Sequence, residues 1–310
     1  MANERGKTID TTHLSIDQAE KRGFLHRDYI AHCLRWSHVV KYMNAKQRYK
    51  TGRVLDVGCG TDLPLAKTFY TSRLILKEYV GIDYNRSDKF DKSAFHTGKM
   101  PVHAYGGVDF AKHVTLEPKD KVTYKVGDVA EHELPSVITC FEVLEHVEPE
   151  HAKRMLLKMS ELLVAARSIH DEVRAFISTP CWNPHVGAAA NHVSEIRREA
   201  LGAVIEDCGF AIVGNWGTFA SMRDYRDHFI ADFEGGREIW DGLCEYYDSN
   251  YLATVLAPLY PQYSRNNLWE IAPAGPSYQR QFPQLDDVEQ PWSSSGDWMG
   301  FKDWKEGATE

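Results

Sequence analysis

The sequence predicts an α/β fold, a doubly wound and mainly parallel seven-stranded sheet with a helical cap insertion. Short apolar runs alternate along the chain with segments of helical periodicity, which is typical of a parallel sheet covered by helices. Residues 53–62 form an apolar run that ends in an acid and two glycines, as expected of a buried strand that enters a tight turn. An aromatic-rich segment, helical in places, separates the last two expected strands and predicts the cap.

Length and composition are those of a globular protein. The 310 residues, 43% hydrophobic and 26% charged, are enough for one large α/β domain with an insertion. No apolar run approaches the roughly 20 residues that a membrane span needs. The first residues lack the apolar core of a signal peptide, so we expect a cytoplasmic protein with no membrane partner. Six scattered cysteines without a Cys-x-x-Cys pair argue against a zinc ribbon or a disulfide framework.

The net charge of -8 argues against duplex DNA as a partner. One stretch differs, because no acid lies between Tyr29 and Leu55. The basic residues in it are Arg35, Lys41, Lys46, Arg48, Lys50 and Arg53. Two interpretations remain open here, a solvated helix face and a phosphate-facing patch.

The first two thirds of the chain are predicted to form a lid and the core. Residues 1–50 are expected to be a leader followed by a helical lid, with apolar side chains at helical spacing from about residue 27 to 49. Residues 51–216 are the expected core. Its strands are predicted at residues 54–57, 79–83, 121–126, 137–141, 173–178 and 210–216, and its helices at 63–72, 149–166 and 194–207. Residues 84–121 are too long for a typical connection, so an irregular insertion is expected there.

The rest of the chain is predicted to cover and extend this core. Residues 217–265 are the expected cap, helical over about 237–256, above the carboxyl edge of the sheet. Residues 266–272 hold the seventh strand. Residues 273–310 form an extended tail with aromatic and acidic residues. Trp292, Trp298 and Trp304 are evenly spaced in this tail, and we expect such rings to pack rather than to remain in water.

The glycine turn indicates the cofactor. A nicotinamide-binding turn requires a third glycine where this chain has Leu63. Asp56 stands two residues before Gly58, where its charge would repel a pyrophosphate but would suit a ligand with an ammonium group. The Asp-x-Gly-x-Gly pattern therefore favours S-adenosylmethionine. A nicotinamide-dependent oxidoreductase remains an alternative.

In this pattern the chain resembles the class I S-adenosylmethionine-dependent methyltransferases over about residues 50–216. The resemblance implies the Rossmann-like methyltransferase fold. It also implies that Asp83, at the second strand end, accepts the ribose hydroxyls and that Asp128 accepts from the adenine amino group. The implied cofactor-binding residues are Asp56, Gly58, Gly60, Asp83, Asp128, Val129 and Phe141. One departure is Asp62, where such turns often have a third glycine.

The run from Cys140 to Pro149, which follows the fourth strand, carries a Glu-x-x-Glu-His motif. It resembles the metal-dependent small-RNA 3′-terminal 2′-O-methyltransferases and the ubiquinone-pathway O-methyltransferases. The resemblance implies a divalent metal held by Glu142, Glu145, His146 and His192. The departures are Cys181 and Trp182 inserted before Asn183, and Asn191 in place of an acid. His185 is a substitute ligand or base.

We therefore expect methyl transfer to an oxygen of a small molecule or of a nucleoside or RNA. Two carboxylates and two imidazoles suit Mg²⁺, Mn²⁺, Fe²⁺ or Zn²⁺, which can lower the pKa of a bound hydroxyl. The catalytic candidates are His146, Glu142 and Glu145. Without a metal, His146 would be a lone general base. A non-catalytic binding module with a methyltransferase fold is a further alternative, and the oligomeric state is left open.

Overall fold

A computed structural model describes residues 27–85, 89–95, 98–117, 122–184, 187–189 and 191–293. The helices are α2 (Arg27–Asn44), α3 (Pro64–Thr71), α4 (Phe110–His113), α5 (Pro149–Ala166), α6 (Arg198–Asp207), α7 (Met222–Asp232), α8 (Gly236–Cys244) and α9 (Ser249–Leu256). The strands are β1 (Arg53–Val57), β2 (Glu78–Asp83), β3 (Val102–Gly106), β4 (Val114–Leu116), β5 (Thr123–Val126), β6 (Ala130–Glu133), β7 (Val137–Phe141), β8 (Arg174–Pro180), β9 (Phe210–Phe219) and β10 (Asn266–Pro273).

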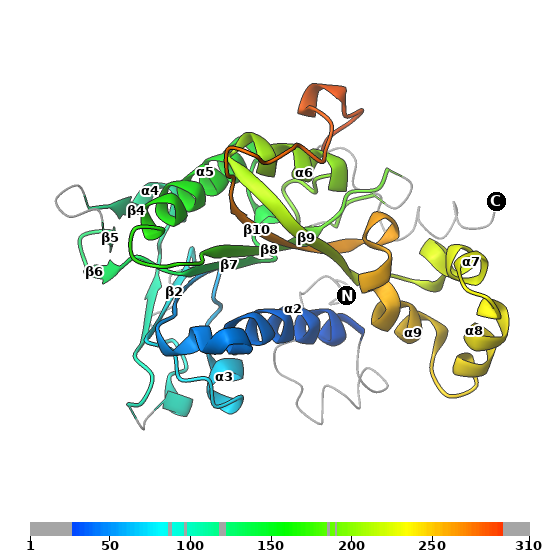
Figure 1. Cartoon of the computed structure of the whole chain (residues 1–310), viewed down its shortest axis with the longest axis horizontal. Helices are drawn as coiled ribbons and strands as arrows, with labels where there is room; N and C mark the ends of the chain where they lie inside the picture. The colour runs from blue at the N-terminus through cyan, green and yellow to red at the C-terminus, as the bar shows by residue number, and fades with distance from the viewer. Residues whose placement is uncertain are drawn as a thin grey trace, which may run out of the picture.

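The predicted seven-stranded sheet is confirmed. Its strand order is β3-β2-β1-β7-β8-β10-β9, and every pair is parallel except those that involve β10. Helices α2 and α3 lie on one face of this sheet and α5 and α6 on the other, as the prediction of a doubly wound fold requires (Figure 1). Because β1, β2, β7 and β8 are parallel, their carboxyl ends meet at one edge, where such folds bind their ligands.

The prediction of the third strand was wrong. The sheet takes its third strand from Val102–Gly106, inside the segment expected to be irregular, and β3 lies at the sheet edge beside β2 alone. The predicted strand at residues 121–126 is instead β5, in a separate antiparallel sheet of order β4-β5-β6. An edge strand needs no continuous apolar run, and all five residues of β3 remain at least partly exposed, so its pattern was weak.

Two apolar layers hold the helices to the large sheet. On one face, α5 and α6 bury side chains such as Leu156 and Ile205 against β1, β2, β7 and β8. On the other face, α2 buries Val39 and Met43 in a layer with Tyr79 and Phe176. The predicted lid helix is therefore part of the core packing. It also lies against β9 and α9.

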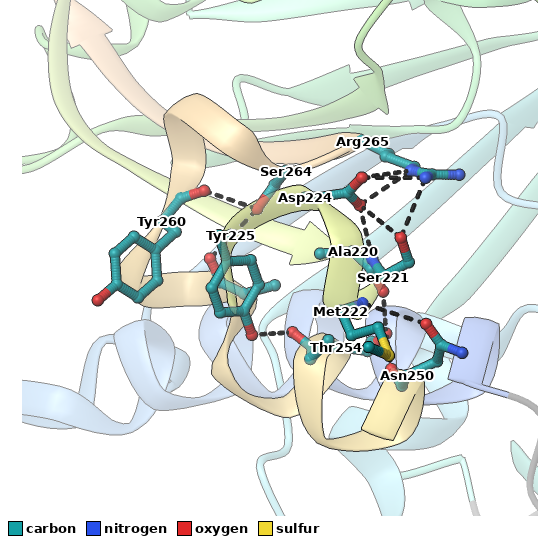
Figure 2. Close-up of polar contacts among 12 residues, drawn as sticks. Ala220, Ser221, Met222, Asp224, Tyr225, Asn250, Thr254, Tyr260, Ser264 and Arg265 are labelled. Carbon is teal, nitrogen blue, oxygen red and sulfur yellow. Dashed lines mark hydrogen bonds and ion pairs between the residues drawn. The ribbon is translucent and has the colours of Figure 1, made fainter. Parts of the chain in front are cut away.

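The helices α7, α8 and α9 form the segment between β9 and β10, where the cap was predicted, and share a small apolar core of their own. Side-chain contacts join the start and the end of this segment. Asp224 closes a capping box with Ser221 at the start of α7, and its carboxylate binds the Arg265 guanidinium, which stands just before β10 (Figure 2). Thr254 donates a hydrogen bond of 2.9 Å to the carbonyl of Ala220 in the same group.

The described part of the tail packs on the core. Phe282 lies against the buried Trp269, with ring centroids 5.4 Å apart. Trp292 pairs with Ile196 in an isolated antiparallel bridge. Trp298 and Trp304 lie outside the described residues. Within the described ranges, no helix combines the length and the apolar character that crossing a membrane would take.

Candidate active site

The glycine turn after β1 presents bare backbone at the carboxyl edge of the sheet. Gly58 and Gly60 have φ of +76° and +64°, which favour glycine. A Cβ at Gly58 would lie 2.3 Å from Cγ2 of Val143, whereas one at Gly60 would meet no atom within 4 Å. Leu63, at the position of the nicotinamide motif's third glycine, is buried and also has a positive φ of 50°. The turn thus leaves open space at Gly60 for a ligand.

The two predicted acids of this region differ in position. Asp83 lies at the mouth of the turn, where its carboxylate accepts hydrogen bonds from the backbone N–H of Gly60 at 3.0 Å and of Asn85 at 2.8 Å. Asp56 is buried behind the turn and accepts hydrogen bonds from the hydroxyls of Thr139 and Tyr79. Burial raises the pKa of Asp56 to about 6. Asp56 therefore supports the turn from within the protein.

A cleft of about 800 Å³ extends from this turn along the sheet edge. Its lining includes Gly58, Asp83, Asp109, Glu142 and His146. Asp109 is buried, with one carboxylate oxygen 3.0 Å from Nζ of Lys112 and the other 3.2 Å from Nε2 of His151. The three acids that follow β2, β3 and β7 thus meet in one cleft.

Asp128 and Val129 lie elsewhere. They are exposed residues in the turn between β5 and β6, and Val129 lines a separate cavity of about 420 Å³. The structure places Asp109, and not Asp128, beside Asp83, because the third strand of the sheet is β3. The adenine contact expected of Asp128 stays a prediction, and Asp109 is the acid after a strand of the large sheet that lines the cleft.

Glu142 has an unusual backbone conformation, and both of its carboxylate oxygens have partners. It has a φ of 56°, which is uncommon for a residue other than glycine. Its Oε1 lies 2.5 Å from Nη1 of the buried Arg35 on α2 and accepts a hydrogen bond of 2.8 Å from Ser178. Its Oε2 accepts a hydrogen bond of 2.8 Å from Asn266 on β10. Arg35 therefore ties the lid helix to the end of β7.

The other three predicted ligands lie together. Glu145, His146 and His192 each offer a ligand atom, and these atoms lie within 4.8 Å of one another. Backbone N–H groups of Val193 and Ser194 donate to the carbonyl of Glu145, which holds the His192 segment against the short helix at Leu144–His146. Glu142 does not belong to this group, since Arg35, Ser178 and Asn266 occupy its oxygens. Of the four predicted ligands, the structure brings these three within reach of one ion.

The imidazoles of this group are oriented as metal-binding imidazoles usually are. Nδ1 of His146 lies 3.2 Å from the carbonyl oxygen of Asn191, and Nδ1 of His192 lies 2.6 Å from the Glu195 carboxylate. The Asn191 carbonyl can only accept, so Nδ1 of His146 carries a proton, and the Glu195 carboxylate orients the ring of His192 through Nδ1. The Asn191 substitution noted above thus leaves Glu195 to orient His192.

The charge of the group also fits a cation. Burial, and then the nearby Glu142, raise the pKa of the Glu145 carboxyl well above its usual range. Partial burial and the neighbouring His192 lower the pKa of His146. Both shifts disfavour the charged forms in the empty group, and a divalent cation would favour the carboxylate and the neutral imidazoles. His185 lies outside the described residues.

A second group that offers three ligand atoms within 4.8 Å of one another is Glu78, His103 and His132. It lies away from the cleft, because Glu78 opens β2 at the amino end of that strand. The basic stretch before β1 is paired with acids in large part. Beyond the Arg35 pair, Lys46 and Arg48 bind Glu172, and Arg53 binds Glu133. A phosphate-facing patch on this stretch therefore finds no support.

Two site residues escaped the sequence reasoning. Arg35 was noted only as one of several basic residues, and its partner Ser178 is 143 residues away. Asp109 did carry a signal, because Gly106-Gly107-Val108-Asp109 repeats the pattern of glycine and acid at a strand end. The length of residues 84–121 predicts an irregular insertion, and this expectation hides the pattern.

Comparison with known proteins gives one family match. A model of the methyltransferase domain family matches residues 26–214. No curated protein sequence matches the chain significantly. Three solved structures have similar folds. They are magnesium protoporphyrin IX methyltransferase from Synechocystis PCC 6803 (13% identity, 79% of this chain and 84% of that one, TM-score 0.44), 1,6-didemethyltoxoflavin-N1-methyltransferase from Burkholderia thailandensis (11%, 84% and 86%, 0.45) and a SAM-dependent methyltransferase from Archaeoglobus fulgidus (16%, 84% and 99%, 0.41).

The raised pKa of Asp56 predicts a pH-dependent stability. Between its usual pKa of 3.8 and about 6, the folded protein keeps a proton that the unfolded chain releases. The free energy of unfolding should therefore fall by up to about 3 kcal/mol as the pH rises through this window, and the term should be constant above it. Asp56→Asn should lack this fall when urea unfolding is followed from pH 4 to 7. Parallel curves for the two proteins would contradict it.

The Arg35–Glu142 pair predicts a strong coupling. Arg35→Met should lower the free energy of unfolding by about 2–3 kcal/mol, less than for a fully buried pair, because 27% of the Glu142 side chain remains exposed. Adding Glu142→Gln should restore part of the loss, as measured by urea unfolding. Arg48→Met, which breaks a more exposed pair, is the matched control and should cost about 1 kcal/mol or less. Additive effects of the two changes at Arg35 and Glu142 would refute the coupling.

Proposed function

Because this chain belongs to the methyltransferase domain family and is an S-adenosylmethionine-dependent methyltransferase, we propose that it methylates a hydroxyl oxygen with the help of a divalent metal. The observation that carries this proposal is the group Glu145, His146 and His192 at the cleft that begins at the glycine turn. Family membership removes the nicotinamide oxidoreductase and the non-catalytic module from consideration.

For the cofactor, we assign the three parts of the cleft to three parts of the ligand. The backbone at Gly58 and Gly60 would hold the methionine end, and Asp83 the ribose hydroxyls. Asp109 would accept from the adenine amino group in place of Asp128. When bound, S-adenosylmethionine supplies a methyl group on a positively charged sulfur. The carboxylates of the cleft favour a cation of this kind.

The proposed chemistry gives the Nε2 lone pair of His146 one of two roles. Glu145, His146 and His192 would hold the metal, which when bound would supply Lewis-acid assistance that lowers the pKa of the acceptor hydroxyl, so that its proton leaves to solvent. Without a metal, the lowered pKa of His146 keeps the imidazole neutral near pH 7, and its Nε2 accepts the proton of the hydroxyl. Glu142 positions rather than reacts, because its oxygens are committed to Arg35, Ser178 and Asn266.

The segments around the core would divide the remaining tasks. We propose that residues 51–216 bind the cofactor, that residues 1–50 contribute the lid and that residues 217–265 form the cap on the acceptor side. The last strand at residues 266–272 would join cap and core through Asn266, and residues 273–293, the described part of the tail at 273–310, would pack against the outside of the core. The acceptor is a hydroxyl of a small molecule or of a nucleoside or RNA.

The cofactor assignment predicts a contrast between two acids. Asp109→Asn should weaken binding of S-adenosylhomocysteine by about tenfold or more, because a hydrogen bond to a charged group is lost from the cleft. Asp128→Asn is the matched control and should leave the affinity within about twofold. Isothermal titration calorimetry measures both. The reverse order of effects would return the adenine contact to Asp128.

The metal assignment predicts a contrast among the acidic residues. Glu145→Gln or His192→Ala should weaken Mn²⁺ binding by more than about tenfold, with affinity for S-adenosylhomocysteine within a few-fold. Glu142→Gln should keep the Mn²⁺ affinity, since Glu142 is not a ligand. The titrations belong in a His103→Ala background, which disables the group at Glu78. Undiminished Mn²⁺ binding in both ligand variants would exclude the site.

A further inference from the structure

We infer that a cavity between β8, α6 and the cap binds the phosphate of a nucleotide acceptor. This inference rests on the proposed function and specifies its acceptor. The cavity measures about 510 Å³, within the usual range for small-ligand sites. Its charged lining consists of Arg197, Arg198, Arg223 and Arg265 against Glu199 and Asp224, which leaves an excess of positive charge.

The arginines of this cavity fall into two groups. Arg265 is neutralised by the carboxylate of Asp224, which stands near the start of α7 (Figure 2). Arg198 donates a hydrogen bond of 2.8 Å to the side-chain oxygen of Asn215 and lies 3.4 Å from the carboxylate of Glu199. Arg197 and Arg223 have no carboxylate partner within the part of the chain that the structure describes. These two guanidinium groups therefore remain available to an anion.

Buried donors in the lining also lack acceptors. Nε1 of Trp182, a residue only 5% exposed, has no hydrogen-bond partner, and neither has Nε of Arg197. The Arg197 guanidinium carbon lies 5.1 Å from the centre of the Trp182 ring. Leaving a buried donor unpaired is costly, so a small shift of either side chain toward acceptor oxygens in the cavity is favoured. A phosphate offers three such oxygens, and planar guanidinium groups suit it.

The cavity also offers a surface for a base. The ring of Tyr263 lines it, remains 37% exposed, and stacks on His228 with centroids 4.0 Å apart and planes within 9°. Bases stack on such aromatic faces with little dependence on sequence. Phosphate and base contacts together indicate a nucleotide rather than a simple anion.

Short chain segments connect this cavity to the proposed metal ligands. His192 and Arg197 lie on one segment, which bridges to Cys181 at the end of β8 through Ile196. Thr179, two residues before Cys181, donates a hydrogen bond to Glu145. The cavity and the proposed ligands thus lie at the same end of β8. A phosphate in the cavity would thus place a sugar hydroxyl toward the cleft.

The test is titration of the full chain, with S-adenosylhomocysteine present, with uridine 5′-monophosphate and with uridine. The phosphate should improve affinity by about tenfold or more, and Arg197→Gln, Arg223→Gln or Trp182→Phe should remove most of this gain. Arg226→Gln is the matched control, because Arg226 lies on the same helix as Arg223 but pairs with Asp227 outside the cavity. It should leave the gain within about twofold.

A short single-stranded RNA with a 5′-phosphate distinguishes the source of the nucleotide. Tighter binding than the monophosphate, with the same arginine dependence, supports a strand as acceptor, and failure of the RNA alone supports a free nucleotide. Equal affinity of monophosphate and uridine, or equal losses in Arg223→Gln and Arg226→Gln, overturns the inference. Failure of S-adenosylhomocysteine to bind would instead overturn the cofactor assignment, so the two proposals fail separately.

Discussion

The contact between Arg35 and Glu142 joins the parts of this molecule on which the rest depends. Glu142 follows β7 and receives Arg35 from α2, Ser178 from β8 and Asn266 from β10. One carboxylate therefore links the lid helix, the centre of the sheet and the strand that returns from the cap. The positive φ of Glu142 redirects the chain after β7, so that Glu145 and His146 follow immediately in a short helix. The strain at Glu142 is maintained because its side chain is held from three sides.

Because of this pair, the two acids of the motif, which stand three residues apart, have different partners. Glu142 is neutralised by a fixed guanidinium, whereas Glu145 is buried beside imidazoles that can lose or gain charge. Glu142 is still close enough to raise the pKa of Glu145, and the Arg35 guanidinium partly offsets this repulsion. The arrangement gives one acid a structural partner within the protein and leaves the other able to bind a cation. The first glutamate of the Glu-x-x-Glu-His motif thus has a structural role, whereas the second glutamate and the histidine are proposed metal ligands.

The sequence predicted the elements whose signals are local. The run into Gly58 and Gly60, the apolar strands β7 and β8, and the acid at the end of β2 are all recognisable from neighbouring residues. β3 was missed because an edge strand shows a weak apolar pattern, and with it Asp109, which lines the cleft, was not considered. Arg35 could not be assigned, because its role depends on contacts with residues far away in sequence. The residue types of the proposed metal ligands were thus predictable from the sequence. The contacts that occupy the carboxylate of Glu142 were not.

The arginines around the cap differ in whether they have an acidic partner. Arg265 immediately precedes Asn266, the first residue of β10. The ion pair with Asp224 and the hydrogen bond to Glu142 are therefore made by consecutive residues. A change in the cap's position would therefore act directly on the carboxylate that anchors the lid. Arg197, on the segment that follows His192, has no carboxylate partner among the residues that the structure describes. Arg197 and Arg223, by contrast, both line the cavity between β8, α6 and the cap. Together with the paired Arg198 and Arg265, they give this cavity an excess of positive charge on a protein whose net charge is negative.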